Sequence, residues 1–228
     1  MIGISIYGCR QETVLIDPNK TNAGKVETVL SSSDTSLNYN QGVEYHQQGN
    51  LEKAITKYRE TIDADPKHAG AHLNLGTIYH TQGKFNHAIM SYKKVILVNP
   101  DYLEAHLNLG AVYRAQGNYE DAAKEYKEAI RIDPDDSMAR YNLGDIYYKQ
   151  GETDQAISQF KEVVRINPQD AEVHNILACL FSVNNQESLA IESLRNAIQL
   201  DITFRENAKT NVLFSNIRKN SKFQELVQ

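Results

Sequence analysis

Histidine is the residue type in this sequence best suited to chemistry, because imidazole binds metal ions and transfers protons near neutral pH. Seven histidines are present, and His72, His106 and His174 are separated by one or two intervals of 34 residues. Equivalent residues of stacked helical repeats lie on the order of 10 Å apart, whereas zinc needs nitrogen ligands at about 2.0–2.1 Å. These histidines cannot share one ion. We interpret them as packing residues and expect no metal site and no cofactor.

Other catalytic patterns are missing from the sequence. It contains no Ser/His/Asp arrangement with supporting context, no glycine-rich phosphate loop and no CxxC pair. Acidic pairs such as Glu120-Asp121 and Asp135-Asp136 stand where helices are expected to begin. Negative charge there offsets the helix dipole, which is a structural role. We therefore expect no catalytic residue and no enzymatic activity.

The two cysteines, Cys9 and Cys179, do not make a disulfide framework. Cys9 ends a short apolar run, MIGISIYGC, and a polar segment rich in Asn, Ser and Thr follows it. This resembles the tail of a bacterial lipoprotein signal, in which the cysteine after a small residue is lipidated, although the run is short and lacks a basic start. Lipidation of Cys9 is thus an alternative to an ordinary frayed terminus. It is the one membrane anchor we expect, because no apolar run reaches 18 residues.

A repeated pattern positions all of these residues. The segment Leu103–Asp136 contains two helical patterns that are separated at Gly117 and end at Pro134, and the same pattern returns at intervals of 34 residues. Four series of residues recur in register: Leu75, Leu109 and Leu143, each followed by Gly; Tyr45, Tyr79, Tyr113 and Tyr147, with Phe181; Ala54, Ala88, Ala122, Ala156 and Ala190; and Pro66, Pro100, Pro134 and Pro168.

The period and the L-G-x2-Y, A-x3-F/Y and Pro pattern resemble the tetratricopeptide repeat (TPR) family. The resemblance implies an all-α fold, a right-handed α-α superhelix of five helix-turn-helix repeats. The repeats are residues 35–68, 69–102, 103–136, 137–170 and 171–204. Residues 1–33 are then a flexible N-terminal segment, and residues 205–228 are expected to form capping helices that shield the last apolar face.

Glycine occurs at two kinds of position in each repeat. Gly110 stands between Leu109 and Tyr113 in the first helix, where glycine is about 1 kcal/mol less favourable than alanine, so its recurrence predicts a close helix crossing. Gly117 and its equivalents follow the first helix, where the cap position favours a residue with left-handed backbone conformation. The fifth repeat has Asn185 there. We expect the recurring alanines of the second helix to complete the close crossing.

A row of asparagines gives the best candidate binding site. Sixth positions of four repeats carry Asn40, Asn74, Asn108 and Asn142, on the helix side that lines the inner groove of a TPR stack. An amide donates and accepts, so such a row can hold an extended segment by its peptide groups, similar to the asparagine ladder of the nuclear and cytoplasmic sugar transferases with TPR domains. The fifth positions, expected to line shallow apolar pockets beside the row, are Leu73, Leu107 and Tyr141. The alternative is that these amides are simply hydrated.

Charge and position narrow the class of partner. The net charge of −5 gives no phosphate-tracking surface, so nucleic acid is not expected. The TPR clamp that grips acidic C-termini of heat-shock chaperones needs Lys or Arg at the fifth position and Asn at the ninth. Tyr39 and Val43 stand there in the first repeat, which excludes that clamp.

These observations favour a non-enzymatic, cytoplasmic scaffold or adaptor that binds an extended segment of a partner protein in a concave groove. Two alternatives stay open. One is an assembly factor of the bacterial cell envelope, anchored by lipid on Cys9. The other is a regulatory subunit that associates with itself through its convex face.

Overall fold

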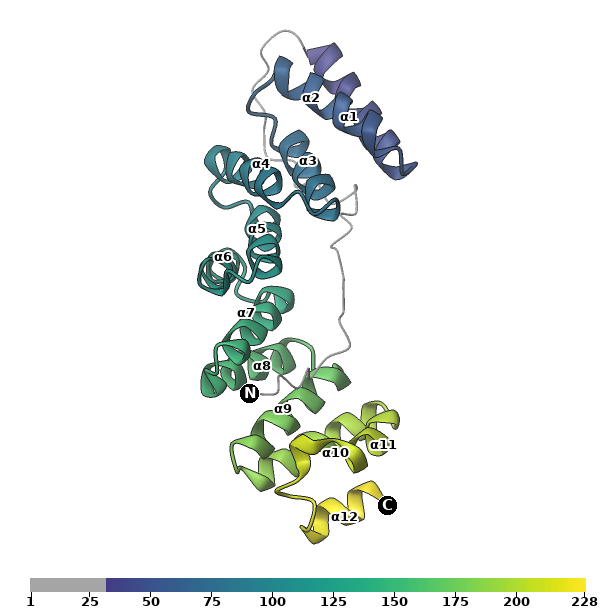
Figure 1. Ribbon diagram of the computed structural model, residues 1–228, viewed down its shortest axis with the longest axis vertical. Helices are drawn as coiled ribbons and strands as arrows, with labels where there is room; N and C mark the ends of the chain where they lie inside the picture. Colours follow the sequence, from purple (N-terminus) through teal and green to yellow (C-terminus); the bar gives the residue numbers. More distant parts are fainter. Residues whose placement is uncertain (1–31) are drawn as a thin grey trace.

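The computed structural model describes residues 32–228, and every regular element in this part of the chain is helical (Figure 1). The ten helices of the repeats are α1 Ser32–Gln47, α2 Leu51–Ala64, α3 Ala69–Thr81, α4 Phe85–Val98, α5 Leu103–Ala115, α6 Tyr119–Ile132, α7 Ser137–Lys149, α8 Thr153–Ile166, α9 Ala171–Val183 and α10 Glu187–Leu200. The chain continues with α11 Thr203–Thr210, the 3-10 helix η1 Val212–Phe214 and α12 Ser221–Val227. None of the described helices combines the length and apolar character needed to cross a bilayer.

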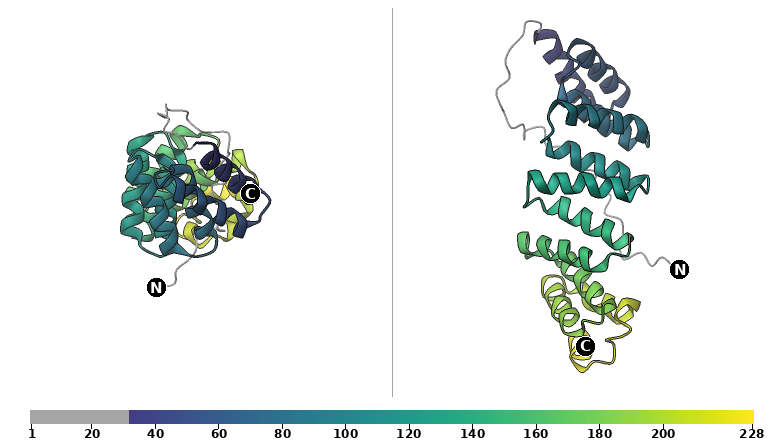
Figure 2. Two further views of the ribbon diagram at one scale, coloured as in Figure 1. Left: turned by 90° about the horizontal axis from the view of Figure 1, so that it is seen from above. Right: turned by 90° about the vertical axis from the view of Figure 1, so that its left-hand side faces the viewer.

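The helices pack as consecutive antiparallel pairs, and each pair contacts the next one along the chain. The pairs form the successive rungs of one stack in the right-hand view of Figure 2. The stack bends so that α3 and α5 lie on its inner side while α4 and α6 lie on its outer side (Figure 1). This architecture confirms the predicted right-handed superhelix of five helix pairs.

In the first four pairs the two helices cross closely at the recurring glycine of the first helix, and the fifth pair has Ala178 at that position. A Cβ atom added to Gly76 would lie 2.6 Å from Cε1 of Tyr92, and one added to Gly110 would lie 2.8 Å from Cε1 of Tyr126. No Cβ fits at such distances, so glycine is required and the predicted close crossing is confirmed. The side chain that fills the contact is the aromatic residue four positions after the recurring alanine, and not the alanine itself.

The turns inside the pairs use left-handed backbone. Gly117 has a φ of +75° and Asn185 a φ of +56°. Glycine adopts this conformation without a steric penalty, and asparagine is the next most tolerant residue. The glycines that the sequence places after each first helix therefore allow the chain to reverse within three residues.

The C-terminal helices close the last repeat. Phe214 and Phe223 are 0% and 1% exposed, and their ring centroids lie 5.7 Å apart. The hydroxyl of Ser182 in α9 donates a hydrogen bond to the carbonyl of Leu213 at 2.7 Å. The last apolar face of the stack is covered in this way, as the capping interpretation of this segment predicts.

Candidate functional site

The fourth residue of each repeat from the second to the fifth has a structural role. Nε2 of His72, His106 and His174 lies 3.0, 2.9 and 3.1 Å from the carbonyl oxygen of the proline six residues earlier. In the fourth repeat Nε of Arg140 donates to the carbonyl of Pro134 at 2.7 Å. A carbonyl only accepts, so each side chain donates and ties the start of one repeat to the end of the preceding one. The sequence analysis missed Arg140, although its register with the histidines was a usable signal.

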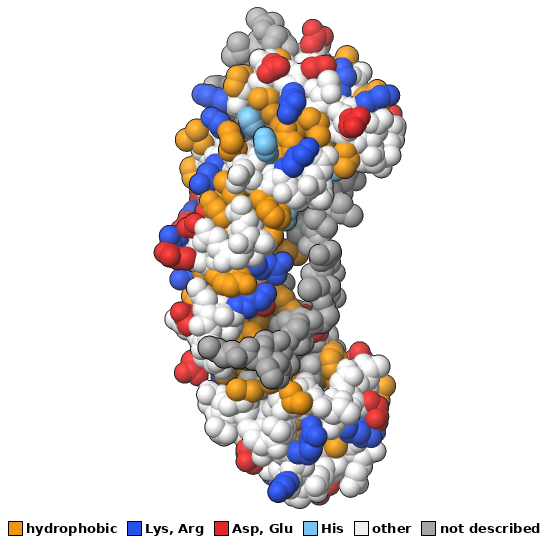
Figure 3. All heavy atoms as spheres, viewed as in Figure 1, with side chains coloured by type: hydrophobic (Ala, Val, Ile, Leu, Met, Phe, Trp, Pro, Cys, Tyr) orange, Lys and Arg blue, Asp and Glu red, His pale blue; other side chains and the backbone are white. Residues whose placement is uncertain are grey.

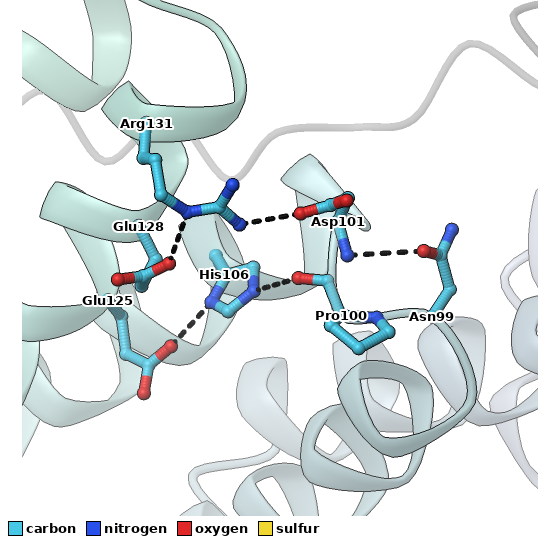
Figure 4. A network of polar contacts seen from close by, with 7 residues as sticks. All are labelled: Asn99, Pro100, Asp101, His106, Glu125, Glu128 and Arg131. Atoms are coloured by element: carbon cyan, nitrogen blue, oxygen red, sulfur yellow. Dashed lines mark hydrogen bonds and ion pairs between the residues drawn. The ribbon is translucent and has the colours of Figure 1, made fainter.

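His106 differs from the other two histidines because it also meets a carboxylate (Figure 4). Its Nδ1 lies 2.7 Å from Oε2 of Glu125, and this contact raises the pKa of His106 above its ordinary value despite the opposing effect of burial. With Nε2–H donated to Pro100, a second proton on Nδ1 completes the contact with the carboxylate. The contact with Glu125 therefore favours the imidazolium form of His106.

An ion pair next to His106 links neighbouring repeats. Arg131 contacts Asp101 of the preceding repeat at 2.5 Å and Glu128 of its own helix at 2.7 Å (Figure 4). Arg165 makes the same contacts with Asp135 and Glu162, at 2.5 and 2.8 Å. All of these side chains are well exposed, so each pair contributes little to stability. These charged groups are therefore paired with one another within the stack.

The asparagine row is placed unevenly along the stack. Asn40 is exposed, Asn74 and Asn142 are half-buried, and Asn108 is 9% exposed. The amide nitrogen of Asn74 donates to the hydroxyl of Tyr39 at 3.4 Å. Nδ2 of Asn108 is buried and makes no hydrogen bond with any described residue. Such an unmet donor is costly, on the order of 1–3 kcal/mol, so a turn of the Asn108 side chain that brings Nδ2 to an acceptor is favoured.

Two of the predicted groove residues belong to the core. Leu73 is 3% exposed and Leu107 is 8% exposed, so they do not form the open apolar pockets that the sequence analysis expects. The reason is that successive first helices touch, as α3 and α5 do, so that the fifth position lies in the seam between repeats. Tyr141, the equivalent residue in α7, is half-buried and packs edge-on against Phe160 at 5.5 Å.

The aromatic side chains of the second helices reach the ninth position of the first helices. The hydroxyl of Tyr92 donates to Oγ1 of Thr77, a ninth-position residue, at 3.3 Å. In the next repeat the ninth residue is Ala111, and the buried hydroxyl of Tyr126 makes no hydrogen bond with any described residue. Burial raises the pKa of Tyr126 to about 12. The third repeat therefore carries two buried polar groups without partners, one on Asn108 and one on Tyr126.

Three charged residues meet where α5 and α7 lie side by side. Oδ2 of Asp145 lies 3.0 Å from Nζ of Lys149 and 3.6 Å from Nη1 of Arg114. The Asp145 side chain is 6% exposed, whereas those of Arg114 and Lys149 are 34% and 40% exposed. Lys149 also lies 6.0 Å from the ring centroid of Tyr119. Spacing along the sequence did not bring these residues together, because Arg114 and Asp145 belong to neighbouring repeats.

The cysteines offer no reactive site within the described residues. Cys179 is 0% exposed, and burial raises the pKa of its thiol to about 12. A thiol of this kind is inert because the nucleophile is the thiolate. Cys9 lies outside the residues that the structure describes, so its lipidation stays a prediction.

Figure 3 shows one face of the stack with its outline hollowed between the two ends. Hydrophobic side chains lie beside Lys and Arg side chains over much of this face. The surface therefore combines apolar and positively charged groups.

Comparison with solved structures finds TPR proteins of similar fold. The chain matches the crystal structure of MamA protein with a TM-score of 0.69 and 23% identity, covering 78% of this chain and 98% of that one. It matches the crystal structure of YrrB, described as a TPR protein with an unusual peptide-binding site, with a TM-score of 0.67 and 22% identity, covering 78% and 93%. A MamA fragment from Desulfovibrio magneticus RS-1 matches with a TM-score of 0.68 and 19% identity, covering 75% and 97%. At these identities the likeness shows the fold.

Comparison with curated protein sequences finds no match. Two family models do match the sequence. The model described as TPR repeat matches residues 42–83 and 76–117, and the one described as Tetratricopeptide repeat matches residues 113–180. Together they span more than half of the chain. The chain therefore belongs to the tetratricopeptide repeat family, whose members present curved stacks of helices as protein-interaction scaffolds.

Proposed function

We propose that this protein is a non-enzymatic scaffold that holds an extended segment of a partner protein along the inner side of α3, α5 and α7. Asn74, Asn108 and Asn142 hold the peptide groups of that segment. The observation that carries the proposal is the buried amide of Asn108, whose Nδ2 has no acceptor among the described residues. A carbonyl group of a bound segment supplies the missing acceptor when the Asn108 side chain, which is 9% exposed, turns its buried Nδ2 towards the groove.

Two further observations support this proposal. The Asn residues recur at one position of successive first helices, although asparagine is a mediocre helix former. YrrB, which shares the fold, is described as having a peptide-binding site. Side-chain selectivity would come from half-buried and charged groups such as Tyr141, because Leu73 and Leu107 are core residues.

The proposal is tested with a bead library of random-sequence peptides, capped at both ends so that only side chains carry charge. The full chain is labelled, and bound beads are counted for the wild type and for the variant Asn74→Ala, Asn108→Ala, Asn142→Ala. We expect the triple variant to lose most of the capture. Its stability should stay near that of the wild type, because loss of the long hydrogen bond from Asn74 to Tyr39 is offset by removal of the unmet donor of Asn108.

A matched control carries three Asn→Ala changes outside the inner row, at Asn86 in α4, Asn196 in α10 and Asn207 in α11. This control should capture peptides as the wild type does, with a thermal unfolding curve to confirm that both variants are folded. If the wild type captures no more than the inner-row variant, the proposed function is wrong.

A further inference from the structure

The charge on the inner side is concentrated where α5 meets α7. Arg114 and Lys149 both approach one oxygen of Asp145, and one carboxylate cannot neutralise two cations. The cluster therefore keeps a net positive charge in a protein whose overall charge is −5. The groups that carry the positive charge are the exposed ones, and the negative group is buried.

The guanidinium of Arg114 has hydrogen-bond donors to spare. Its approach to Asp145 at 3.6 Å is too long for a hydrogen bond, and it donates none to any described residue. Three other arginines of the stack are used internally. Arg59, Arg131 and Arg140 donate to Tyr79, Asp101 and Pro134 respectively. Arg114 is thus positioned by a countercharge while its planar fork, which matches a carboxylate, is uncommitted.

Asp145 acts as the support of this cluster. Its buried carboxylate accepts a hydrogen bond from Lys149 and attracts Arg114, so both flexible side chains are already localised before any partner arrives. Localised cations lose less entropy on binding than free ones. Asn108 lies on the same helix as Arg114, six residues earlier, which is about 9 Å along the axis and about 120° around it. An extended segment that crosses the helix obliquely spans this separation with about four residues.

From these observations we infer that the α5–α7 cluster binds the side-chain carboxylate of an Asp or Glu in the partner segment. This inference rests on the proposed function and adds the chemical class of the partner, an acidic extended segment. The carboxylate contacts Arg114 and Lys149, while a peptide carbonyl of the same segment accepts from Asn108. A side chain is the source of the carboxylate, and not a chain terminus, because the cluster lies in the middle of the stack, so that the segment continues on both sides.

The test uses the same library of doubly capped peptides and the full chain. Peptides on bound beads are sequenced, and the frequency of Asp and Glu is compared with that in the whole library. We expect the wild type to enrich acidic residues. The variant Arg114→Gln, Lys149→Gln removes both charges but keeps amide donors for Asp145, and should reduce that enrichment about five- to tenfold. The variant Asp145→Asn removes the only negative charge of the cluster while its amide oxygen still accepts from Lys149, so the gain in net positive charge outweighs the weaker support and the enrichment should increase.

The opposite signs of these two variants exclude a general loss of folding as the cause. A control with the same change of charge, Lys94→Gln in α4 with Lys219→Gln near the C-terminus, should enrich acidic residues as the wild type does. If peptides are captured without acidic enrichment, or if the Gln variant retains it, the inference is wrong and the proposed function stands. If the wild type captures no more peptide than the inner-row Asn→Ala variant, both are wrong.

Discussion

Replacing Tyr126 by phenylalanine should make the free protein more stable. The residue is 0% exposed, and its hydroxyl is buried without a hydrogen-bond partner among the described residues. Phenylalanine keeps the ring that packs on Gly110 and removes only the unmet polar group. The fourth repeat already has this arrangement, since Phe160 lies on Gly144 at the equivalent position.

The size of the effect follows from the cost of an unmet buried group. Leaving a hydroxyl without a partner costs about 1–3 kcal/mol, so Tyr126→Phe should raise the free energy of unfolding by about 1 kcal/mol. Tyr92 provides the matched comparison, because it is equally buried but donates to Thr77 at 3.3 Å. Tyr92→Phe loses that bond and should lower the free energy of unfolding by about 0.5–1.5 kcal/mol.

Urea unfolding and thermal unfolding, each followed by circular dichroism, compare the stability of both variants with that of the wild type. For a chain of this size each kcal/mol corresponds to about 2–4 °C in the unfolding midpoint on heating, so the two variants should separate clearly. If Tyr126→Phe destabilises as much as Tyr92→Phe, the hydroxyl of Tyr126 has a partner in solution, and our account of the third repeat is wrong.

Two further predictions concern charge and packing. Because Glu125 raises the pKa of His106, their contact stabilises the fold fully below about pH 6.5, the unfolded pKa of histidine, and loses this effect as the pH rises through the higher folded pKa. The difference in free energy of unfolding between the wild type and Glu125→Gln should therefore be about 1–2 kcal/mol near pH 6 and should shrink towards pH 9. A difference that does not vary with pH would contradict this prediction. Leu73→Ala should cost about 2–5 kcal/mol because the side chain is 3% exposed, whereas Leu97→Ala, at 74% exposure, should leave the urea midpoint almost unchanged; equal effects would place Leu73 at the surface.

The repeat architecture could be predicted in detail because it depends on local patterns. The turn at Gly117 requires a positive φ, and Pro134 ends a helix, independently of the residues that surround them in space. The 34-residue period repeats both signals and so fixes the boundaries of the repeats. The close helix crossing at Gly110 was also predictable. Its partner was not, because the ring of Tyr126 reaches the glycine only through the angle at which α5 and α6 cross.

The candidate site was predicted only in part. The sequence identified the asparagine row and its helix side, but Leu107 shares that side by spacing and is nevertheless 8% exposed. Helical periodicity gives the direction of a side chain and not the distance to the next repeat. The approach of Arg114 to Asp145 has the same origin, since the two residues belong to different repeats.

The sequence by itself determined the family, the helices, the turns and the order in which the helix pairs stack, because each of these follows from the residues within one repeat. The tertiary structure decided which polar groups find partners. Thr77 accepts from Tyr92, whereas Ala111 at the equivalent position offers no partner to the hydroxyl of Tyr126. Hydrogen bonding requires atoms from separate helices to lie within about 3.5 Å, and that condition is set by how closely the helices pack in space.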